Sequence, residues 1–204
     1  MINRPEYLNM LKSFKDKDLI KVITGIRRCG KSTLFDIYIN YLKESGVEDN
    51  QIIKINLEDS NYSELDNSLK LEKYIEKRLL PNKKNYIFLD EVQTVSEFQK
   101  ACDSLYIKKN IDLYITGSNA YLLSGELATL LSGRYIEIKM MPLSFKEYIS
   151  AVGEVDLSNK YKNYITNGSF PYILELNTKK EKNVYLESIF NSIIIKDIVI
   201  RKKI

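Results

Sequence analysis

The chain has 204 residues, 44% of them hydrophobic and 28% charged, and its 31 basic and 27 acidic residues leave a net charge of +4. This length suits one sizeable domain or one domain with a small appendage, and so weak a positive charge does not by itself indicate a nucleic-acid partner. The sequence contains no histidine, which excludes a Ser-His-Asp triad, a Cys-His pair and histidine metal ligands. Any catalysis must therefore use lysine, arginine, carboxylates, hydroxyls and a borrowed metal.

Nothing in the sequence indicates a membrane or secretory protein. No apolar run approaches the roughly 18 residues that a membrane span needs, and the opening MINRPEYLNMLKSF has neither an apolar core nor a small-residue cleavage site. The two cysteines, Cys29 and Cys102, lie in different segments and suggest no disulfide framework. We therefore expect a cytoplasmic protein with no membrane partner.

Short apolar runs rich in β-branched residues alternate with longer segments of helical periodicity. Continuous apolar runs of this length are typical of strands that are buried on both faces of a parallel sheet. The expected strands cover residues 19–24, 52–58, 86–90, 111–118 and 135–140. The expected helices between them cover residues 32–45, 63–80, 96–109 and 120–131. A strand followed by a helix, repeated about four times, predicts an α/β layered fold with right-handed crossovers.

The pattern changes after Pro142, where three helical segments follow with no convincing strand between them. These segments cover residues 143–152, 158–167 and 181–200. We therefore predict an α/β core over residues 1–141 and a small helical region over residues 142–204.

The stretch GIRRCGKS fits the pattern G-x-x-x-x-G-K-[ST], with Gly25, Gly30, Lys31 and Ser32 at its fixed positions. The motif follows an expected strand and opens an expected helix, which is the context in which it binds phosphates. The backbone N–H groups of the loop and of the helix N-terminus would face the phosphate oxygens. Lys31 would reach the β- and γ-phosphates, and Ser32 would offer its hydroxyl to Mg²⁺.

Three unusual residues, Arg27, Arg28 and Cys29, occupy variable positions of this loop. The N–H groups of the two arginines are available to phosphates whatever their side chains do. Those side chains could face a neighbouring subunit, a lid helix or nucleic acid, and the sequence alone does not choose among these. A helix N-terminus can lower the pKa of a thiol, but no resolving cysteine or general base is near Cys29 in the sequence, so redox use is not favoured.

The run YIFLDEVQ predicts an apolar strand that ends in Asp90 and Glu91. Beside a phosphate loop, Asp90 would hold Mg²⁺ together with Ser32 and water. Glu91 would point towards the γ-phosphate and orient the attacking water as a base. Simple P-loop kinases usually lack the second carboxylate, so Glu91 favours hydrolysis.

The next expected strand, in LYITGSN, ends with the polar residues Thr116, Ser118 and Asn119, and one arginine precedes the last strand, in LLSGRYIEI. Asn119, with Ser118 as the alternative, would contact the γ-phosphate or the attacking water, although either residue could instead cap the next helix. Arg134 could stabilise transition-state charge on its own nucleotide or on that of a neighbour, as an arginine finger does. The alternative for Arg134 is an ordinary surface arginine.

The motifs and their order resemble the AAA+ ATPases of the bacterial and archaeal group in which an ATPase core precedes a C-terminal domain of the DUF4143 type. The matching segments run through nearly the whole chain: RPEYL, VITGIRRCGKSTL, IFLDEVQ, ITGSNAYLLS, LSGRYIEI, PLSFKEY, GSFPYILE and IIIKDIV. The resemblance implies a P-loop NTPase fold, a three-layer α/β sandwich whose five-strand parallel sheet has the order 5-1-4-3-2, with a helical lid. It implies ATP and Mg²⁺ bound at Gly25–Thr33, Asp90 and Glu91, and it supports Arg134 as the finger.

Within this group the loop often contains paired arginines, so Arg27 and Arg28 look like a group signature and Cys29 looks like a variable filler. The cofactor-binding set that the resemblance implies includes these three residues and extends to Thr33. The segment NGSFPY departs from the more usual GG-F-P pattern. The DUF4143-type domain should begin where this chain ends, at Ile204, so we expect the chain to lack that domain.

We therefore expect an ATP-hydrolysing AAA+ module that is slow in isolation. Lys31 and Arg134 would stabilise phosphate charge, Ser32 and Asp90 would hold Mg²⁺, and Glu91 would activate water. Residues after Pro142 would form a lid over the adenine side, and Arg4 and Tyr7 in RPEYL would cover the base from the other side. If Arg134 acts in trans, the active form is a homo-oligomer.

Three other functions are compatible with parts of the sequence. The first is a nucleotide-gated switch with little turnover that regulates a C-terminal domain or a DNA-associated partner. The second is a P-loop kinase for a small molecule, which would need an arginine-rich lid, whereas residues 142–180 contain no arginine. The third is a DNA-associated regulator with incidental ATPase activity, which salt-dependent DNA binding would reveal.

Overall fold

The computed structural model describes residues 2–117 and 131–193, and the chain forms two compact units. We call the first the sheet unit; it comprises Pro5–Gly25 and Lys31–Lys139. We call the second the helical unit; it comprises the residues before Pro5, the segment Ile26–Gly30 and the residues from Met140 onwards. The proposed boundary after residue 141 remains a prediction.

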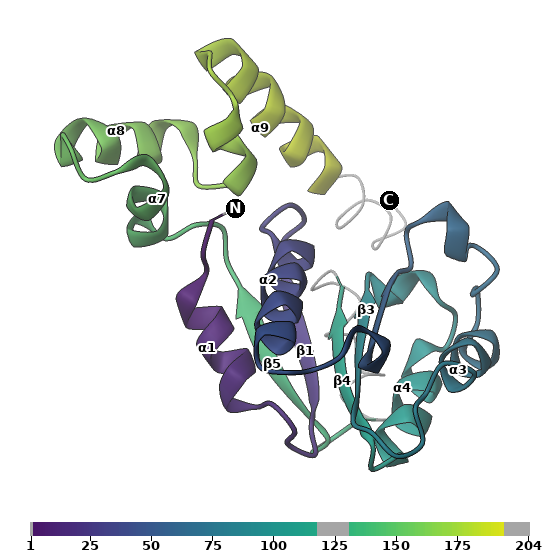
Figure 1. Ribbon diagram of the computed structural model, residues 1–204. Coiled ribbons are helices and arrows are strands. Elements are labelled where there is room, and N and C mark those ends of the chain that lie inside the picture. Colours follow the sequence, from purple (N-terminus) through teal and green to yellow (C-terminus); the bar gives the residue numbers. More distant parts are fainter. Residues whose placement is uncertain (1, 118–130, 194–204) are drawn as a thin grey trace. The chain divides into compact units, whose positions relative to one another are not determined.

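Five parallel strands form the sheet in the order β2-β3-β4-β1-β5 (Figure 1). Their bounds are β1 (Ile20–Gly25), β2 (Ile52–Asn56), β3 (Asn85–Asp90), β4 (Ile111–Thr116) and β5 (Tyr135–Met140). This order, read from the other edge, is the predicted 5-1-4-3-2, which is therefore confirmed. The register pairs Ile23 of β1 with Thr116 of β4, and Leu89 of β3 with Ile115 of β4. The carboxyl ends of β1, β3 and β4 consequently lie side by side.

The burial of each strand reflects its position in the sheet. All six residues are buried in β1 and in β3, as expected of inner strands covered on both faces. In the edge strand β2, Ile53 and Ile55 are buried whereas Lys54 and Asn56 are exposed. That alternation marks a strand with only one covered face.

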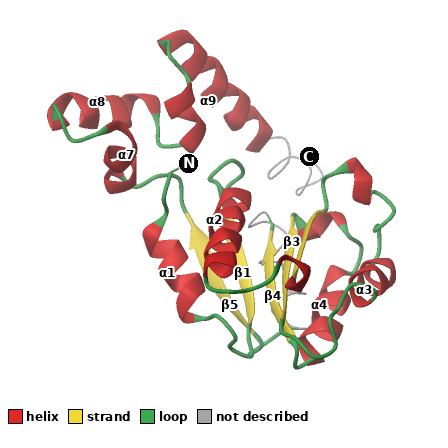
Figure 2. Ribbon diagram, viewed as in Figure 1, coloured by secondary structure: helices red, strands yellow, loops and turns green. Residues whose placement is uncertain are grey.

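Helices cover both faces of the sheet, giving three layers (Figure 2). The helices of the sheet unit are α1 (Pro5–Ser13), α2 (Lys31–Glu44), α3 (Ser68–Glu76) and α4 (Phe98–Ile107). On one face, Phe35 and Tyr38 of α2 pack against the rings of Phe88 and Tyr114. On the other face, α3 and α4 bury their apolar side chains in one cluster with the alternate strand residues, among them Ile87, Leu89, Leu113 and Ile115.

Two helices differ from the sequence prediction. No helix was predicted over α1, whose only buried residue is Leu11. The predicted helix over 63–80 is shorter because the Asn67 side chain accepts a hydrogen bond from the backbone N–H of Lys70 at 3.1 Å, an N-cap that starts α3 at Ser68. The predicted helix over 120–131 lies almost wholly outside the described residues.

The helical unit contains α7 (Phe145–Val152), α8 (Leu157–Asn167) and α9 (Lys179–Ile193), with a 3₁₀ turn, η4 (Pro171–Glu175). These helices follow the predicted segments as far as the description extends. The rings of Phe145 and Tyr148 on α7 pack against Tyr164 on α8 at centroid distances of 5.4 and 5.5 Å. None of the described helices is long and apolar enough to cross a lipid bilayer.

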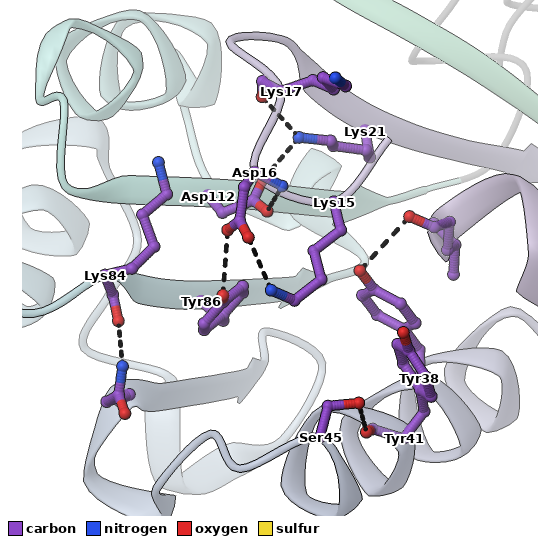
Figure 3. Close-up of polar contacts among 12 residues, drawn as sticks. Lys15, Asp16, Lys17, Lys21, Tyr38, Tyr41, Ser45, Lys84, Tyr86 and Asp112 are labelled. Atoms are coloured by element: carbon purple, nitrogen blue, oxygen red, sulfur yellow. Dashed lines mark hydrogen bonds and ion pairs between the residues drawn. The ribbon is translucent and has the colours of Figure 1, made fainter. Parts of the chain in front are cut away.

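A buried polar network lies where β1 and β4 begin, at the opposite end of these strands from the phosphate loop. Figure 3 shows Asp16, Lys21, Tyr38 and Asp112 of this network. The Lys21 ammonium donates to Asp112 at 2.5 Å, and both side chains are fully buried. The Tyr114 hydroxyl donates to the other Asp112 oxygen at 2.8 Å, and the backbone N–H of Asp16 donates to that same oxygen at 2.8 Å. The Tyr38 hydroxyl bonds Tyr114 at 2.9 Å, so the network joins α2 and the segment before β1 to the sheet.

Candidate nucleotide-binding site

The phosphate loop leaves β1 at Gly25 and enters α2 at Lys31, which is the strand–loop–helix context that its motif predicts. A tight turn forms within the loop, where the Cys29 N–H donates to the Ile26 carbonyl at 3.3 Å. Gly30 has a φ of 102° and Arg28 a φ of 69°. Glycine adopts such angles without steric cost, whereas the left-handed backbone of Arg28 is uncommon for a residue with a side chain.

The side chain of Lys31 turns back towards Gly25, at the start of the phosphate loop. Its side chain is 4% exposed, and its ammonium donates to the Gly25 carbonyl at 3.2 Å. The same nitrogen lies 3.8 Å from Oε1 of Glu91. A buried ammonium requires acceptors, and here the loop carbonyl and the carboxylate supply them. Ser32 and Thr33, on the first turn of α2, are exposed.

The two carboxylates follow the end of β3 in different environments. Asp90 is 2% exposed and accepts a hydrogen bond from the Thr116 hydroxyl. Glu91 is partly exposed, and its backbone is left-handed, with φ 56° and ψ 51°. Its N–H donates to the Thr116 hydroxyl oxygen at 3.1 Å. Such strained backbone positions in non-glycine residues cluster at functional sites.

Two further residues contact the carboxylates. Thr116 was one of the three polar residues expected at its strand end, although Asn119 was preferred, and Gln93 was not predicted. Thr116 bridges Asp90 and Glu91 through one hydroxyl. Gln93 donates from Nε2 to Oε2 of Glu91 at 2.6 Å. The Gln93 carbonyl oxygen is buried and, within residues 2–117 and 131–193, has no hydrogen-bond partner. The place of Thr116 at a strand end is visible in the sequence, whereas only the fold reveals the contact of Gln93.

The structure therefore brings Lys31, Asp90, Glu91 and Thr116 together at the carboxyl edge of the sheet. Asn119 and the alternative Ser118 lie outside the described residues.

Arg134 directly precedes β5, at the opposite end of the strands from the phosphate loop. Its carbonyl accepts from the N–H of Ile20, the first residue of β1, at 2.8 Å, whereas the phosphate loop follows Gly25, the last residue of β1. Six strand residues at about 3.3 Å each separate the two ends. The exposed Arg134 guanidinium bonds the Asp103 carboxylate and lies 5.6 Å from the centre of the Tyr106 ring.

The oxygen donors fit a magnesium ion that is bound together with a nucleotide. Among the described residues, no three acidic, histidine or cysteine side chains gather as a metal cage. Mg²⁺ commonly keeps several waters and takes only one or two protein carboxylates beside substrate phosphates. Asp90 offers one buried carboxylate and Ser32 one exposed hydroxyl, which are donors of that type.

The fold and the phosphate loop define a P-loop ATPase-like protein. The model of the AAA domain family matches residues 17–149, and the chain belongs to that family. AAA domains bind nucleotides.

Two longer relatives have no described activity. An uncharacterized protein of Haemophilus influenzae is 42% identical over 207 residues, which cover 98% of this chain and 51% of that protein. An uncharacterized protein of Methanocaldococcus jannaschii is 32% identical over 201 residues, covering 91% of this chain and 43% of that protein. The chain thus spans about half the length of these relatives.

Solved structures with low sequence identity share the fold. The Walker-type ATPase PABY2304 of Pyrococcus abyssi has a TM-score of 0.60 at 16% identity and covers 100% of this chain and 76% of its own. A DNA polymerase III gamma subunit-related protein of Thermotoga maritima has a TM-score of 0.54 at 13% identity, covering 83% and 56%. The ORC1 protein of Aeropyrum pernix, solved with DNA, has a TM-score of 0.52 at 13% identity, covering 80% and 50%. Identities this low show the fold alone and give no ground for a DNA role.

Proposed function

We propose that this chain is an ATPase module that binds ATP with Mg²⁺ at Gly25–Thr33 and hydrolyses it. The observation that supports this most directly is the convergence of Lys31, Asp90 and Glu91 at the carboxyl ends of β1 and β3, the two strands that flank β4. A phosphate loop alone would serve binding, but the second carboxylate provides a base for water.

Each side chain has a defined task in this proposal. The Lys31 ammonium leaves the Gly25 carbonyl and Glu91 to bind the β- and γ-phosphates. Ser32 and Asp90 hold Mg²⁺, which when bound neutralises charge on the phosphate oxygens. Glu91 accepts a proton from the attacking water. Asn119 is proposed as the residue that contacts the γ-phosphate or that water.

The loop backbone completes the phosphate site. The N–H groups of Arg27, Arg28, Cys29, Gly30 and Thr33 are proposed to face phosphate oxygens, together with those of their neighbours in the motif. Residues 1–141 are proposed as the ATPase core and residues 142–204 as the lid region.

A specific contact favours the alternative of a nucleotide-gated switch with little turnover. The Glu91 carboxylate is already engaged, by Gln93 at 2.6 Å and by Lys31 at 3.8 Å. A base held in this way must be released before it can act on water. In that alternative, nucleotide binding would regulate a C-terminal domain or another partner.

Steady-state ATPase rates for wild type and Glu91→Gln, measured over a range of protein concentrations, test the proposal. We expect the variant to turn over at least about 100-fold more slowly, as loss of a general base does, while ATP affinity measured by titration stays within about twofold. Glu97→Gln is the matched control, because Glu97 is six residues away and pairs only with Lys100 among the contacts described.

The outcomes separate the two functions. If wild type and Glu91→Gln bind ATP equally and show the same negligible turnover, the hydrolase proposal is wrong and the switch replaces it. If neither protein binds ATP, both proposals are wrong.

A further inference from the structure

The guanidinium of Arg4 joins three separate segments of the helical unit. It donates from Nε to Oε1 of Glu147 at 2.6 Å, from Nη1 to the Cys29 carbonyl at 3.0 Å, and from Nη2 to the Met141 carbonyl at 2.6 Å. Arg4 as a whole is 3% exposed. One buried side chain therefore touches the phosphate loop, the segment that follows β5 and the first turn of α7.

The geometry of a guanidinium makes these three contacts interdependent. Its N–H groups form a rigid planar fork, so the positions of the three acceptors are fixed relative to one another. The hydrogen bond to the Glu147 carboxylate is charge-assisted and therefore among the stronger types. A shift at the Cys29 carbonyl must tilt the fork or break one of the other bonds.

Glu147 transfers this constraint to α7. While its Oε1 binds Arg4, its Oε2 accepts from the backbone N–H and the hydroxyl of Ser144, at 2.8 and 2.9 Å. The Ser144 hydroxyl in turn accepts from the Glu147 N–H at 3.3 Å. This reciprocal capping box fixes the start of the helix, so the same carboxylate belongs both to the arginine contact and to the helix cap.

At the other end, Arg4 acts on a peptide group of the phosphate loop. The Cys29 carbonyl that it binds belongs to the same peptide as the Gly30 N–H, and none of the described peptide bonds is cis. In a planar trans peptide the C=O and N–H point in opposite directions. Holding the carbonyl therefore sets the direction of the Gly30 N–H.

The space around Gly30 is filled by the same unit. A Cβ at Gly30 would lie 3.6 Å from the Met140 side chain, 3.8 Å from that of Pro171 and 3.9 Å from Nη1 of Arg4. The loop therefore lies at ordinary van der Waals distance from these residues, so a movement of Gly30 towards them would displace their side chains.

We propose that Arg4 is a positioning residue that orients the Cys29–Gly30 peptide for phosphate and couples occupancy of the loop to the start of α7. This rests on the proposed nucleotide binding. When a nucleotide phosphate accepts a hydrogen bond from the Gly30 N–H, the Cys29–Gly30 peptide changes its orientation. Arg4 and Glu147 transmit this change to Met141 and to the α7 cap. Neither residue touches the nucleotide.

Hydrogen–deuterium exchange with and without Mg-ADP tests this coupling in the intact chain. In the wild type we expect ADP to slow exchange both around residues 31–36 and around residues 143–150. Arg4→Lys retains the positive charge beside Glu147 but lacks the three-way fork. We expect it to bind ADP about tenfold more weakly, as for one lost charge-assisted hydrogen bond, and to lose the response around 143–150.

We call the Arg4 contact with the loop carbonyl and the Glu147 contact with the α7 cap the relay. A second variant separates these two parts, and its result does not depend on whether Arg4→Lys folds. Glu147→Gln leaves the bond from Arg4 to the loop carbonyl in place, so ADP affinity should stay within about twofold while the response around 143–150 is lost. Arg78→Met is the control, because the Arg78 guanidinium donates to the Tyr74 carbonyl within the sheet unit. It should behave as the wild type.

The results distinguish this proposal from the function on which it rests. If ADP protects residues 31–36 in every protein and Arg4→Lys and Glu147→Gln retain the full response around 143–150, the relay is wrong and nucleotide binding stands. If ADP protects no residues in the wild type, nucleotide binding fails and the relay fails with it.

Discussion

The Thr116 hydroxyl connects the two carboxylate residues of the candidate site, because it donates to Asp90 and accepts from the Glu91 N–H. Thr116→Val removes this hydroxyl with little change in shape. We expect kcat to fall about tenfold, because both carboxylates lose part of their positioning. The free energy of unfolding should fall by about 1–3 kcal/mol, since the buried Asp90 loses a donor. Steady-state kinetics and urea denaturation measure the two effects.

Thr24→Val is the matched control for that variant. Thr24 is also fully buried and lies on the neighbouring strand β1, but its hydroxyl donates to Glu137 at 2.5 Å. We expect its stability to fall without loss of kcat. Equal losses of kcat in the two variants would show that Thr116 has no special relation to the site.

Gln93 gives a prediction in which activity and stability change in opposite directions. Gln93→Leu removes the donor to Glu91 and also the buried carbonyl oxygen for which the described residues show no partner. We expect kcat to fall about tenfold as Glu91 loses its orientation. Stability should stay the same or rise by about 1 kcal/mol, because an unsatisfied buried group is costly. Gln51→Leu, which removes a contact to the Lys84 carbonyl, is the control.

A rise in kcat for Gln93→Leu would contradict this interpretation. It would show that Gln93 restrains Glu91, which is what the switch alternative requires.

At the scale of elements, the sequence predicts the strands better than the helices. The apolar runs that form β1 and β3 are buried at every position, so their composition alone indicates inner strands. The start of α3 depends instead on one side-chain cap at Asn67 rather than on apolar spacing, and α1, which buries only Leu11, was not predicted. The strand order came from the family resemblance, since local patterns do not encode which strands are neighbours.

The residues of the candidate site also fall into those that the sequence predicts and those that only the fold reveals. The spacing of Gly25, Gly30 and Lys31 predicts the loop because those contacts are local in sequence. Gln93 could not be selected, and Arg4 was expected at the base rather than at the loop carbonyl, because the first contact depends on the turn after β3 and the second on acceptors 25 to 143 residues away. Long-range contacts of this kind follow from packing rather than from spacing.

The buried polar network between α2 and the sheet should make stability sensitive to alkaline pH. Burial raises the pKa of Tyr38 and of Tyr114 above the ordinary tyrosine value. Because the folded protein holds these protons more tightly than the unfolded chain, the stabilisation is complete below about pH 10. It is lost as the pH rises through the raised pKa values.

Tyr38→Phe tests this dependence. It should lower the free energy of unfolding by about 1 kcal/mol at neutral pH through lost hydrogen bonds and make the decline above pH 10 shallower. Burial lowers the pKa of Lys21, which contributes with the opposite sign in both proteins, so their difference isolates the tyrosine. Urea midpoints at pH 8, 9, 10 and 11 measure it. Parallel curves for the two proteins would show that Tyr38 does not contribute.

At the scale of the whole molecule, the chain passes between its two compact units at four peptide bonds. These follow Arg4, Gly25, Gly30 and Lys139. The middle of the phosphate loop therefore belongs to the helical unit, while its flanking residues belong to the sheet unit.

The position of Arg134 has a consequence for assembly. It lies beside Ile20, at the opposite end of β1 from Gly25 and the phosphate loop. A strand of six residues spans about 20 Å, which places its own nucleotide out of reach. If Arg134 stabilises phosphate charge, it must do so for a neighbouring copy, and the active form is then a homo-oligomer.

Mixing two inactive variants tests this directly. Arg134→Ala retains its own nucleotide site but offers no finger, whereas Lys31→Ala offers a finger but has a defective site. In trans, an equimolar mixture should recover up to about a quarter of wild-type turnover, since a quarter of randomly formed interfaces join an intact site to an intact arginine. Each variant alone should be inactive at every concentration.

Full activity of Arg134→Ala alone would instead make Arg134 a surface residue, held only by Asp103 and Tyr106 among the described contacts. Two inactive variants that do not complement each other, although both bind to the wild type, would also contradict the trans assignment.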